Sequence, residues 1–237
     1  MDDLQYCGKE LALFAEVRNW KRYWSGTLRR FLAGDVLEAG AGTGSNTEFL
    51  SQGSSGRWVC LEPDASLLAQ LAETLKATGT RVYETCRGTM ASIEASWRFD
   101  TILYIDVLEH IEDDAAELRR ASAHLRAGGR LVVLSPAHQW LYSPFDASIG
   151  HFRRYSKGML RAISPPGMEI DAMLHLDSAG LLASAANRVL LRQAMPTVAQ
   201  LRLWDRRIIP VSRILDRLTG HLIGKTVIAV WKKPLVA

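Results

Sequence analysis

The chain has 237 residues, of which 48% are apolar and 23% charged. These proportions are those of a packed globular protein and exclude wholesale disorder or a fibrous repeat. The net charge of +4 arises within residues 200–225, which carry six basic and two acidic residues. We interpret this segment as a solvated helix face, with a nucleic-acid or lipid-headgroup surface as the alternative.

The sequence predicts neither a membrane span nor a secretion signal. Its longest stretch without a formal charge, residues 131–145, is shorter than the ~20 apolar residues of a membrane helix and contains two prolines. Met1 is followed by two acids rather than by an apolar signal segment, so we expect no secretory leader. Three cysteines without CxxC spacing predict neither a disulfide framework nor a zinc site and favour the cytoplasm.

Apolar runs and amphipathic segments alternate through the first two thirds of the chain. The runs occupy residues 35–40, 57–62, 81–86, 99–106 and 130–136. Such runs are typical of strands buried on both faces of a parallel sheet. We expect one helix over residues 64–79 and another over residues 113–129, the second burying Leu118 and Leu125. This alternation predicts a doubly wound, mostly parallel, seven-stranded Rossmann-like α/β sheet, whose ligands bind at the carboxyl ends of the strands.

Helical segments flank this sheet on both sides. Trp20, Trp24, Leu28 and Phe31 stand at helical spacing before the first strand. Residues 168–176 and 226–231 predict the sixth and last strands, and the insert between them has a helical pattern. Its apolar residues are Val211, Ile214, Leu215, Leu218 and Leu222, preceded by a break at Pro210. We interpret the insert as a cap over the open edge of the sheet that encloses substrate.

The expected organisation is therefore a single domain over residues 1–237. Its parts are an N-terminal helical cap (1–34), a cofactor-binding core (35–176), a helical substrate cap (177–225), and the last strand with its tail (226–237).

A glycine loop leaves the first strand and enters a helix. Residues 38–44 read Glu-Ala-Gly-Ala-Gly-Thr-Gly, an ExGxGxG pattern. A dinucleotide fingerprint places its third glycine one position later, where this chain has Ser45. The Glu38 carboxylate suits a bound ammonium group and is a poor neighbour for a pyrophosphate. The glycines permit a tight turn and close approach of a ligand to the backbone.

Further polar residues follow the next strands. Glu62 ends the second strand, where an acid can accept hydrogen bonds from both ribose hydroxyls. Thr89 and Met90 follow the third strand, where a backbone amide and an apolar side chain could hold a purine ring. Asp106 ends the fourth strand and begins the segment Asp-Val-Leu-Glu-His-Ile.

At this point the sequence resembles the class I S-adenosylmethionine-dependent methyltransferases, over about residues 35–136. It looks most like the bacterial small-molecule subgroup of type 11/12 that carries a VLEHI-type segment. The resemblance implies S-adenosyl-L-methionine as cofactor and S-adenosyl-L-homocysteine as product. The positions expected to bind the cofactor are Glu38, Gly40, Gly42, Gly44, Asn46, Glu62, Pro63, Thr89, Met90, Asp106 and Val107. Thr89 departs from the family pattern, since many members have Asp there.

His110 is the first candidate for a catalytic base, because a histidine titrates near neutral pH and this one follows the fourth strand. The alternative is a residue packed beneath the cofactor. Asp106, Glu109 and His110 also have the spacing of metal ligands on one helical face. Because Asp106 has an expected cofactor role and the residues between look like core, we expect no metal.

A second polar cluster follows the fifth strand. His151 could act as the base with Asp146 orienting it, and Arg153 or Arg154 could hold an anionic substrate. The structural alternative is a loop tied by an Asp–Arg pair with Tyr155 in the core. DxxxGHxRRY segments recur in relatives of this subgroup. The expected substrate-binding residues are Arg153, Arg154, Tyr155, Trp140 and Trp20.

The function we expect is methyl transfer to an oxygen of a small-molecule or lipid-like acceptor, in biosynthesis. Nitrogen, or a carboxylate or phosphate, is the alternative acceptor group. The alternative outside the methyltransferases is a non-catalytic or NAD-binding Rossmann-like protein. No Asn-Pro-Pro-Tyr-like segment follows the fourth strand, so we expect no nucleic-acid partner. Weak contact with a membrane surface and the oligomeric state stay open.

Overall fold

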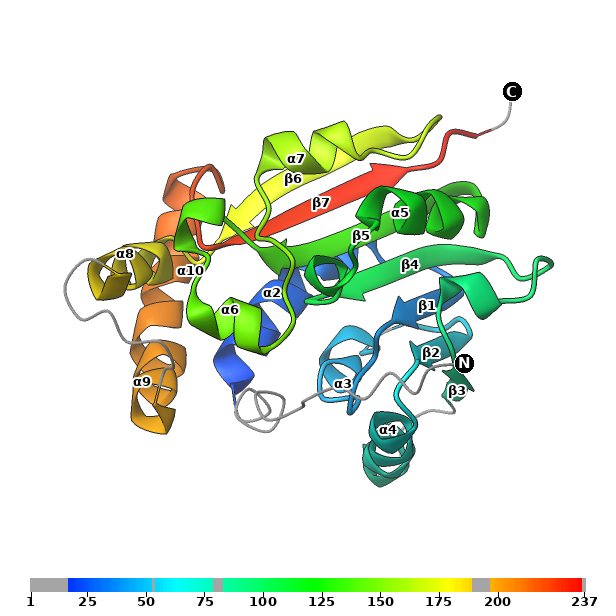
Figure 1. The fold of residues 1–237 in the computed structure, drawn as a ribbon, viewed down its shortest axis with the longest axis horizontal. Helices are drawn as coiled ribbons and strands as arrows, with labels where there is room; N and C mark the ends of the chain where they lie inside the picture. The colour runs from blue at the N-terminus through cyan, green and yellow to red at the C-terminus, as the bar shows by residue number, and fades with distance from the viewer. Residues whose placement is uncertain (1–16, 53, 79–82, 189–196, 236–237) are drawn as a thin grey trace.

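A computed structural model describes residues 17–52, 54–78, 83–188 and 197–235. Within these residues, seven strands form one sheet in the order β3-β2-β1-β4-β5-β7-β6 (Figure 1). The strands are β1 Val36–Ala39, β2 Trp58–Glu62, β3 Glu84–Arg87, β4 Phe99–Ile105, β5 Leu125–Pro136, β6 Glu169–Leu176 and β7 Thr226–Lys232. β7 runs antiparallel between β5 and β6. The predicted α/β fold with a mostly parallel sheet is confirmed.

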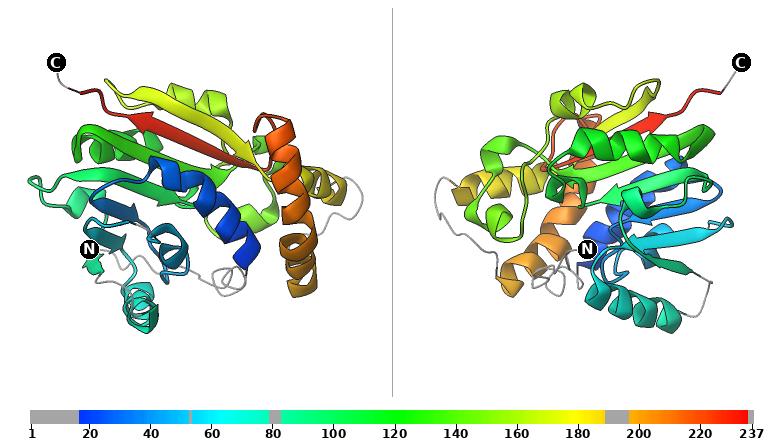
Figure 2. Two further views of the ribbon diagram at one scale, coloured as in Figure 1. Left: turned by 180° about the vertical axis from the view of Figure 1, so that it is seen from behind. Right: turned by 45° about the vertical axis from the view of Figure 1, so that its right-hand side comes forward.

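Helices cover both faces of the sheet (Figure 2). The α-helices are α2 Arg18–Leu28, α3 Thr47–Leu50, α4 Ala65–Thr78, α5 Asp114–Ala123, α6 Pro144–Ser148, α7 Lys157–Ala162, α8 Ser178–Ala186, α9 Val198–Leu203 and α10 Ile209–Leu218. A π-helical turn, Trp204–Ile208, joins α9 to α10. Short 3₁₀ turns are η1 Arg29–Phe31, η2 Met90–Ser92, η3 Leu108–His110 and η4 Gln139–Leu141. Side chains of α2, α4 and α10 pack on one face, and those of α5 and α7 pack on the other.

Because both faces are covered, the central strands are buried along their length. Every residue of β1 and β2 is buried, as the near-continuous apolar runs predict. The burial expected for the run at residues 81–86 is wrong, because β3 lies at the edge of the sheet and is largely exposed. Asp64 caps α4 by accepting hydrogen bonds from the backbone N–H groups of Ser66 and Leu67. The expected helix before the first strand is confirmed as α2, with Trp20 and Trp24 buried. Gly79, residues 81–82 and Cys7 lie outside the described residues.

The end of the second predicted helix is wrong. α5 stops at Ala123, and Leu125 is a buried residue at the start of β5, opposite Phe99. The physical reason lies in the backbone of His124, whose carbonyl accepts a hydrogen bond from the Phe99 N–H. The chain therefore joins the sheet before it reaches the two glycines that we took as the end of the helix.

The helical pattern of the insert does not mark the buried side of α10. The helix forms, but Val211, Ile214, Leu218 and Leu222 are exposed and Leu215 is half-buried. Polar residues face inward instead, because Ser212 donates a hydrogen bond to Asp177 and Tyr23 donates one to Asp216. None of the described helices combines the length and the apolar character that a bilayer-spanning helix requires. The division of the chain into caps and core stays a prediction.

Candidate active site

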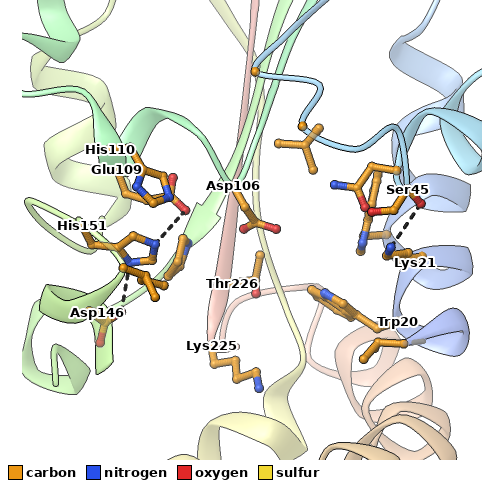
Figure 3. A pocket seen from close by; sticks show the side chains of 18 of the residues that line it. Trp20, Lys21, Ser45, Asp106, Glu109, His110, Asp146, His151, Lys225 and Thr226 are labelled. Atoms are coloured by element: carbon orange, nitrogen blue, oxygen red, sulfur yellow. Dashed lines mark hydrogen bonds and ion pairs between the residues drawn. The ribbon is translucent and has the colours of Figure 1, made fainter. Parts of the chain in front are cut away.

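A cavity of about 290 Å³ lies at the carboxyl ends of β1 and β4. These neighbouring strands lead to opposite faces of the sheet, since β1 continues to α3, whose Leu50 packs on one face, and β4 continues to α5, whose Leu118 packs on the other. Such a point is where doubly wound sheets bind ligands. Figure 3 shows Glu109, His110, His151 and Asp146 on one side of the cavity, Lys21 and Ser45 on the other, and Asp106 between them.

The glycine loop borders this cavity in a left-handed backbone conformation. φ is +67° at Gly40, +57° at Gly42 and +78° at Gly44. A Cβ at Gly40 would lie 2.6 Å from the Val107 side chain, and one at Gly44 would lie 2.7 Å from that of Leu71. A Cβ at Gly42 would meet nothing within 4 Å, and Gly42 lines the cavity. Two of the glycines therefore serve packing, and Gly42 leaves room for a ligand against the backbone.

Glu62 organises this loop. One of its carboxylate oxygens accepts a hydrogen bond from the Gly42 N–H at 2.8 Å, and the other accepts one from the Asp64 N–H at 3.0 Å. Burial raises the pKa of Glu62, and the two N–H donors oppose that shift. Each carboxylate oxygen has a second lone pair, so Glu62 can also accept from a ligand hydroxyl.

Glu38 is buried beneath the loop rather than in the cavity lining. Its carboxylate accepts a hydrogen bond from the Trp58 indole N–H at 3.1 Å. Burial raises the pKa of Glu38 to about 7, because an ionised carboxylate loses its hydration there. Hydrogen bonding from Thr47 and Trp58 opposes this shift, and the expected contact of Glu38 with a cofactor ammonium group stays a prediction.

Asp146 holds the polar cluster after β5 together. Nδ1 of His151 lies 3.1 Å from one oxygen of Asp146, and the Arg154 guanidinium donates to both oxygens at 2.9 Å. Ser143 donates to Asp146 through its backbone N–H and its hydroxyl, each at 2.8 Å. Burial raises the pKa of Asp146, but the hydrogen bonds from His151 and Arg154 outweigh it and hold the pKa well below its usual range.

An ionised Asp146 can only accept hydrogen bonds, so the proton of this contact is on Nδ1 of His151, and Nε2 is the acceptor atom of the ring in its neutral form. Nε2 lies 3.9 Å from Oε1 of Glu109. This oxygen atom is buried and has no hydrogen-bond partner among the described residues. Burial raises the pKa of Glu109 well above its ordinary value. The imidazole of His151 is thus oriented by one carboxylate and faces a second across the edge of the cavity.

Glu109, His110 and His151 bring one ligand atom each to within 4.8 Å of one another. Two imidazoles and a carboxylate are a ligand set that suits Zn²⁺ or another divalent transition metal. Burial lowers the pKa of His110 to about 4, so its ring is neutral at physiological pH, as a ligand must be. This group differs from the Asp106, Glu109 and His110 spacing that the sequence analysis considered and set aside: His151 takes the place of Asp106, and the segment forms a 3₁₀ turn rather than an α-helix.

Sequence reasoning missed two lysines that line the cavity. Lys21 of α2 donates a hydrogen bond to the Ser45 carbonyl at 3.1 Å, and burial lowers its pKa to about 8. Nζ of Lys225 lies 3.5 Å from Asp177 and 4.0 Å from the centre of the Trp204 ring. Neither lysine is near a recognisable motif, so only their spatial position connects them with the site.

The structure brings some of the predicted site residues together and separates others. Those that line the cavity are Gly40, Gly42, Asn46, Asp106, His110, Asp146, His151, Arg154 and Trp20. Those outside its lining are Glu38, Gly44, Glu62, Pro63, Thr89, Met90, Val107, Trp140, Arg153 and Tyr155. Arg153 instead pairs with Asp114, and the buried Tyr155 hydroxyl donates to the same carboxylate at 2.7 Å. Half of the Trp140 surface is exposed.

Comparisons with known proteins agree with this architecture. Residues 37–131 match the family model described as a methyltransferase domain. An S-adenosylmethionine-dependent methyltransferase from Clostridium acetobutylicum has a similar fold, with a TM-score of 0.61 at 10% identity and 96% of both chains covered. Coclaurine N-methyltransferase, solved with N-methylheliamine and SAH, gives 0.61 at 14% identity, covering 90% of this chain and 72% of that one.

N-methyltransferase NodS from Bradyrhizobium japonicum gives a TM-score of 0.57 at 14% identity, covering 93% of this chain and 97% of that one. No curated protein sequence matches the chain. At 10–14% identity these solved structures establish the fold alone. The assignment of residues 37–131 to the methyltransferases rests on the family model.

The doubly wound sheet, its glycine loop and the family match together define an enzyme of the methyltransferase class. Residues 37–131 form a methyltransferase domain of the class I, type 11/12 kind, and S-adenosyl-L-methionine is the cofactor that this domain and the similar structures indicate. The residues present fit that cofactor, since the open position at Gly42 admits a ligand against the loop and Glu62 offers acceptors beside it.

Proposed function

We propose that this enzyme transfers the methyl group to a hydroxyl oxygen of a small-molecule or lipid-like acceptor, with His151 as the general base. The observation that carries the proposal is that His151, oriented by Asp146, lines the same cavity as Gly42 of the glycine loop. A base and a cofactor loop on one cavity can serve a single displacement reaction.

When bound, the cofactor supplies a methyl group made electrophilic by a positively charged sulfur. Gly40, Gly42 and Asn46 would hold it at the loop, with Glu62 at the ribose. Asp146 keeps the proton on Nδ1 of His151, so that Nε2 takes the hydroxyl proton as the new C–O bond forms. The products are the methyl ether and S-adenosylhomocysteine, and His151 then returns its proton to solvent.

The cap segment supports enclosure of the reaction. Ser184 of α8 and Trp204 of the π-helical turn line the cavity together with Trp20 of α2. The Trp20 and Trp204 rings lie 5.7 Å apart between their centres. Aromatic walls that exclude water favour an acceptor with an apolar part and suppress hydrolysis of the cofactor. A nitrogen acceptor in the same place would use the same residues.

Positive charge in the cavity favours one alternative, a carboxylate or phosphate acceptor. Arg154 and Lys225 are occupied by Asp146 and Asp177, but Lys21 donates only to the Ser45 carbonyl among its described contacts. An anionic acceptor is already ionised, so it would bind through Lys21 and would need no base.

Turnover of purified enzyme separates these acceptors. We expect transfer of labelled methyl to a hydroxylated acceptor, with His151→Ala lowering kcat and Lys21→Met leaving it nearly unchanged. His124→Ala is the matched control, because His124 lies at the end of α5 and bonds to the Trp97 carbonyl. Dependence on Lys21 without dependence on His151 would assign the anionic acceptor instead.

A further inference from the structure

The surface of the C-terminal helical segment combines apolar and basic side chains in an unusual way. We define the basic-apolar surface by its exposed residues Leu203, Arg206, Arg207, Val211, Arg213, Ile214, Arg217, Leu218 and Leu222. They lie on α9, the π-helical turn, α10 and the turn after it, at the same end of the molecule as α8 (Figure 1).

The apolar part of this surface is large for an exposed helix. Ile214 is 63% exposed, Leu218 is 78% exposed and Leu222 is 70% exposed. Val211, Ile214 and Leu218 stand at i, i+3 and i+7, so they form one stripe along α10. A helix that packs on a protein normally buries such a stripe, whereas α10 buries Ser212 and Asp216 and directs the stripe outward.

The charged part of the surface has a single sign. The segment contains two acids, and both are buried: Asp205 accepts from the backbone N–H of Trp20, and Asp216 accepts from the backbone N–H groups of Asp177 and Ser178. The arginines of the segment are exposed. Within the described residues 197–223, the exposed formal charge is therefore entirely positive.

The occupant that matches both properties is an anionic lipid bilayer. We propose that the basic-apolar surface binds the enzyme to anionic membranes, with α10 lying in the plane of the interface. The apolar stripe would enter the boundary between headgroups and acyl chains, while Arg213 and Arg217 on its flank would contact lipid phosphates. A twofold contact between copies fits less well, because it would place arginines of one copy against those of the other.

The test is sedimentation of the full chain with vesicles of equal parts phosphatidylglycerol and phosphatidylcholine. We expect binding that falls at high salt, because the phosphate contacts are screened. Arg213→Gln and Arg217→Gln should each weaken binding ~5-fold, the equivalent of about 1 kcal/mol for one basic residue near an anionic surface. Ile214→Ser with Leu218→Ser should reduce binding further and leave the far-UV spectrum unchanged, since both residues are exposed.

Two control variants lie elsewhere on the molecule. Ile170→Ser on β6, where Ile170 is 45% exposed, and Arg119→Gln on α5 should bind vesicles like the parent enzyme. Equal binding to vesicles of phosphatidylcholine alone, or no effect of the surface variants, would overturn the proposal. So would self-association in sedimentation velocity that Ile214→Ser abolishes, because the stripe would then be a contact between copies.

Discussion

Nδ1 of His151 lies 3.1 Å from Oδ1 of Asp146, and the same carboxylate receives both ends of the Arg154 guanidinium. This pairing makes Asp146 a fixed, ionised acceptor, so the tautomer of His151 follows from its neighbours. The sequence left two interpretations of this segment, a loop tied by an Asp–Arg pair and a histidine base oriented by Asp146. The two are compatible, because one carboxylate makes both contacts. Asp146 performs the first role, and in the proposed mechanism it also orients His151 for the second.

If His151 is the base, His151→Ala should lower kcat by ~10²–10⁴-fold, the usual contribution of a positioned base. Affinity for S-adenosylhomocysteine should stay at the parent value, because the glycine loop and Glu62 are unchanged. Steady-state kinetics and calorimetric titration measure the two effects. If His151→Ala keeps the kcat of the parent enzyme, His151 is not the base.

Glu62→Ala should weaken S-adenosylhomocysteine binding by about 1–3 kcal/mol. The loss has two sources, since Glu62 is an expected acceptor for the ribose and also receives the Gly42 N–H that shapes the loop. Calorimetric titration gives the change in affinity. Glu84→Ala is the control, because Glu84 lies on the edge strand β3, pairs with Arg57 and does not line the cavity. Unchanged affinity in Glu62→Ala would contradict both roles.

Replacement of Gly42 should mainly affect cofactor binding, whereas replacement of Gly40 should mainly affect stability. Gly42→Ala should impair cofactor binding because its methyl group would enter the cavity, with a stability loss of about 1–2 kcal/mol from the left-handed backbone. Gly40→Ala should lose more stability, because its Cβ would overlap the Val107 side chain. Urea unfolding measures the stability of each variant, and cofactor titration measures its affinity. Equal stability and equal affinity in the two variants would contradict the prediction.

Glu38 should make stability depend on pH. Its native pKa of about 7 lies above the ordinary value of 4.5, so between these values the native state binds more protons than the unfolded state. Stability therefore falls as pH rises through this range, by up to about 3 kcal/mol. Glu38→Gln cannot ionise and should flatten the profile in urea unfolding from pH 5 to pH 8. A profile as steep as that of the parent would show that another group is responsible.

Chelation tests the cluster of Glu109, His110 and His151. With Nε2 of His151 acting as a base, EDTA should leave turnover unchanged, because that atom cannot bind a metal and accept a proton at once. Loss of activity on chelation, restored by Zn²⁺ or Mn²⁺ in the parent but not in His110→Ala, would assign the cluster to a metal instead.

Short local patterns in the sequence were sufficient for the fold and the class. The strand β1, the ExGxGxG loop and the acid that ends β2 each lie within a few consecutive residues, and strands covered on both faces are mostly apolar whatever surrounds them. Their order along the chain predicts the doubly wound sheet, and with it the edge where a cofactor binds. The amphipathic period of residues 211–222 likewise predicts a helix.

Tertiary structure alone decided which side chains meet. His151 reaches Glu109 only because the segment after β5 folds back across the end of β4, and Lys21 reaches Ser45 from a helix that precedes the sheet. It also decided that α10 buries its polar side, since the Tyr23 hydroxyl and two backbone N–H groups need Asp216 as their acceptor. A hydrophobic period records where apolar residues recur, whereas the side that is buried depends on which hydrogen-bond partners lie beneath the helix.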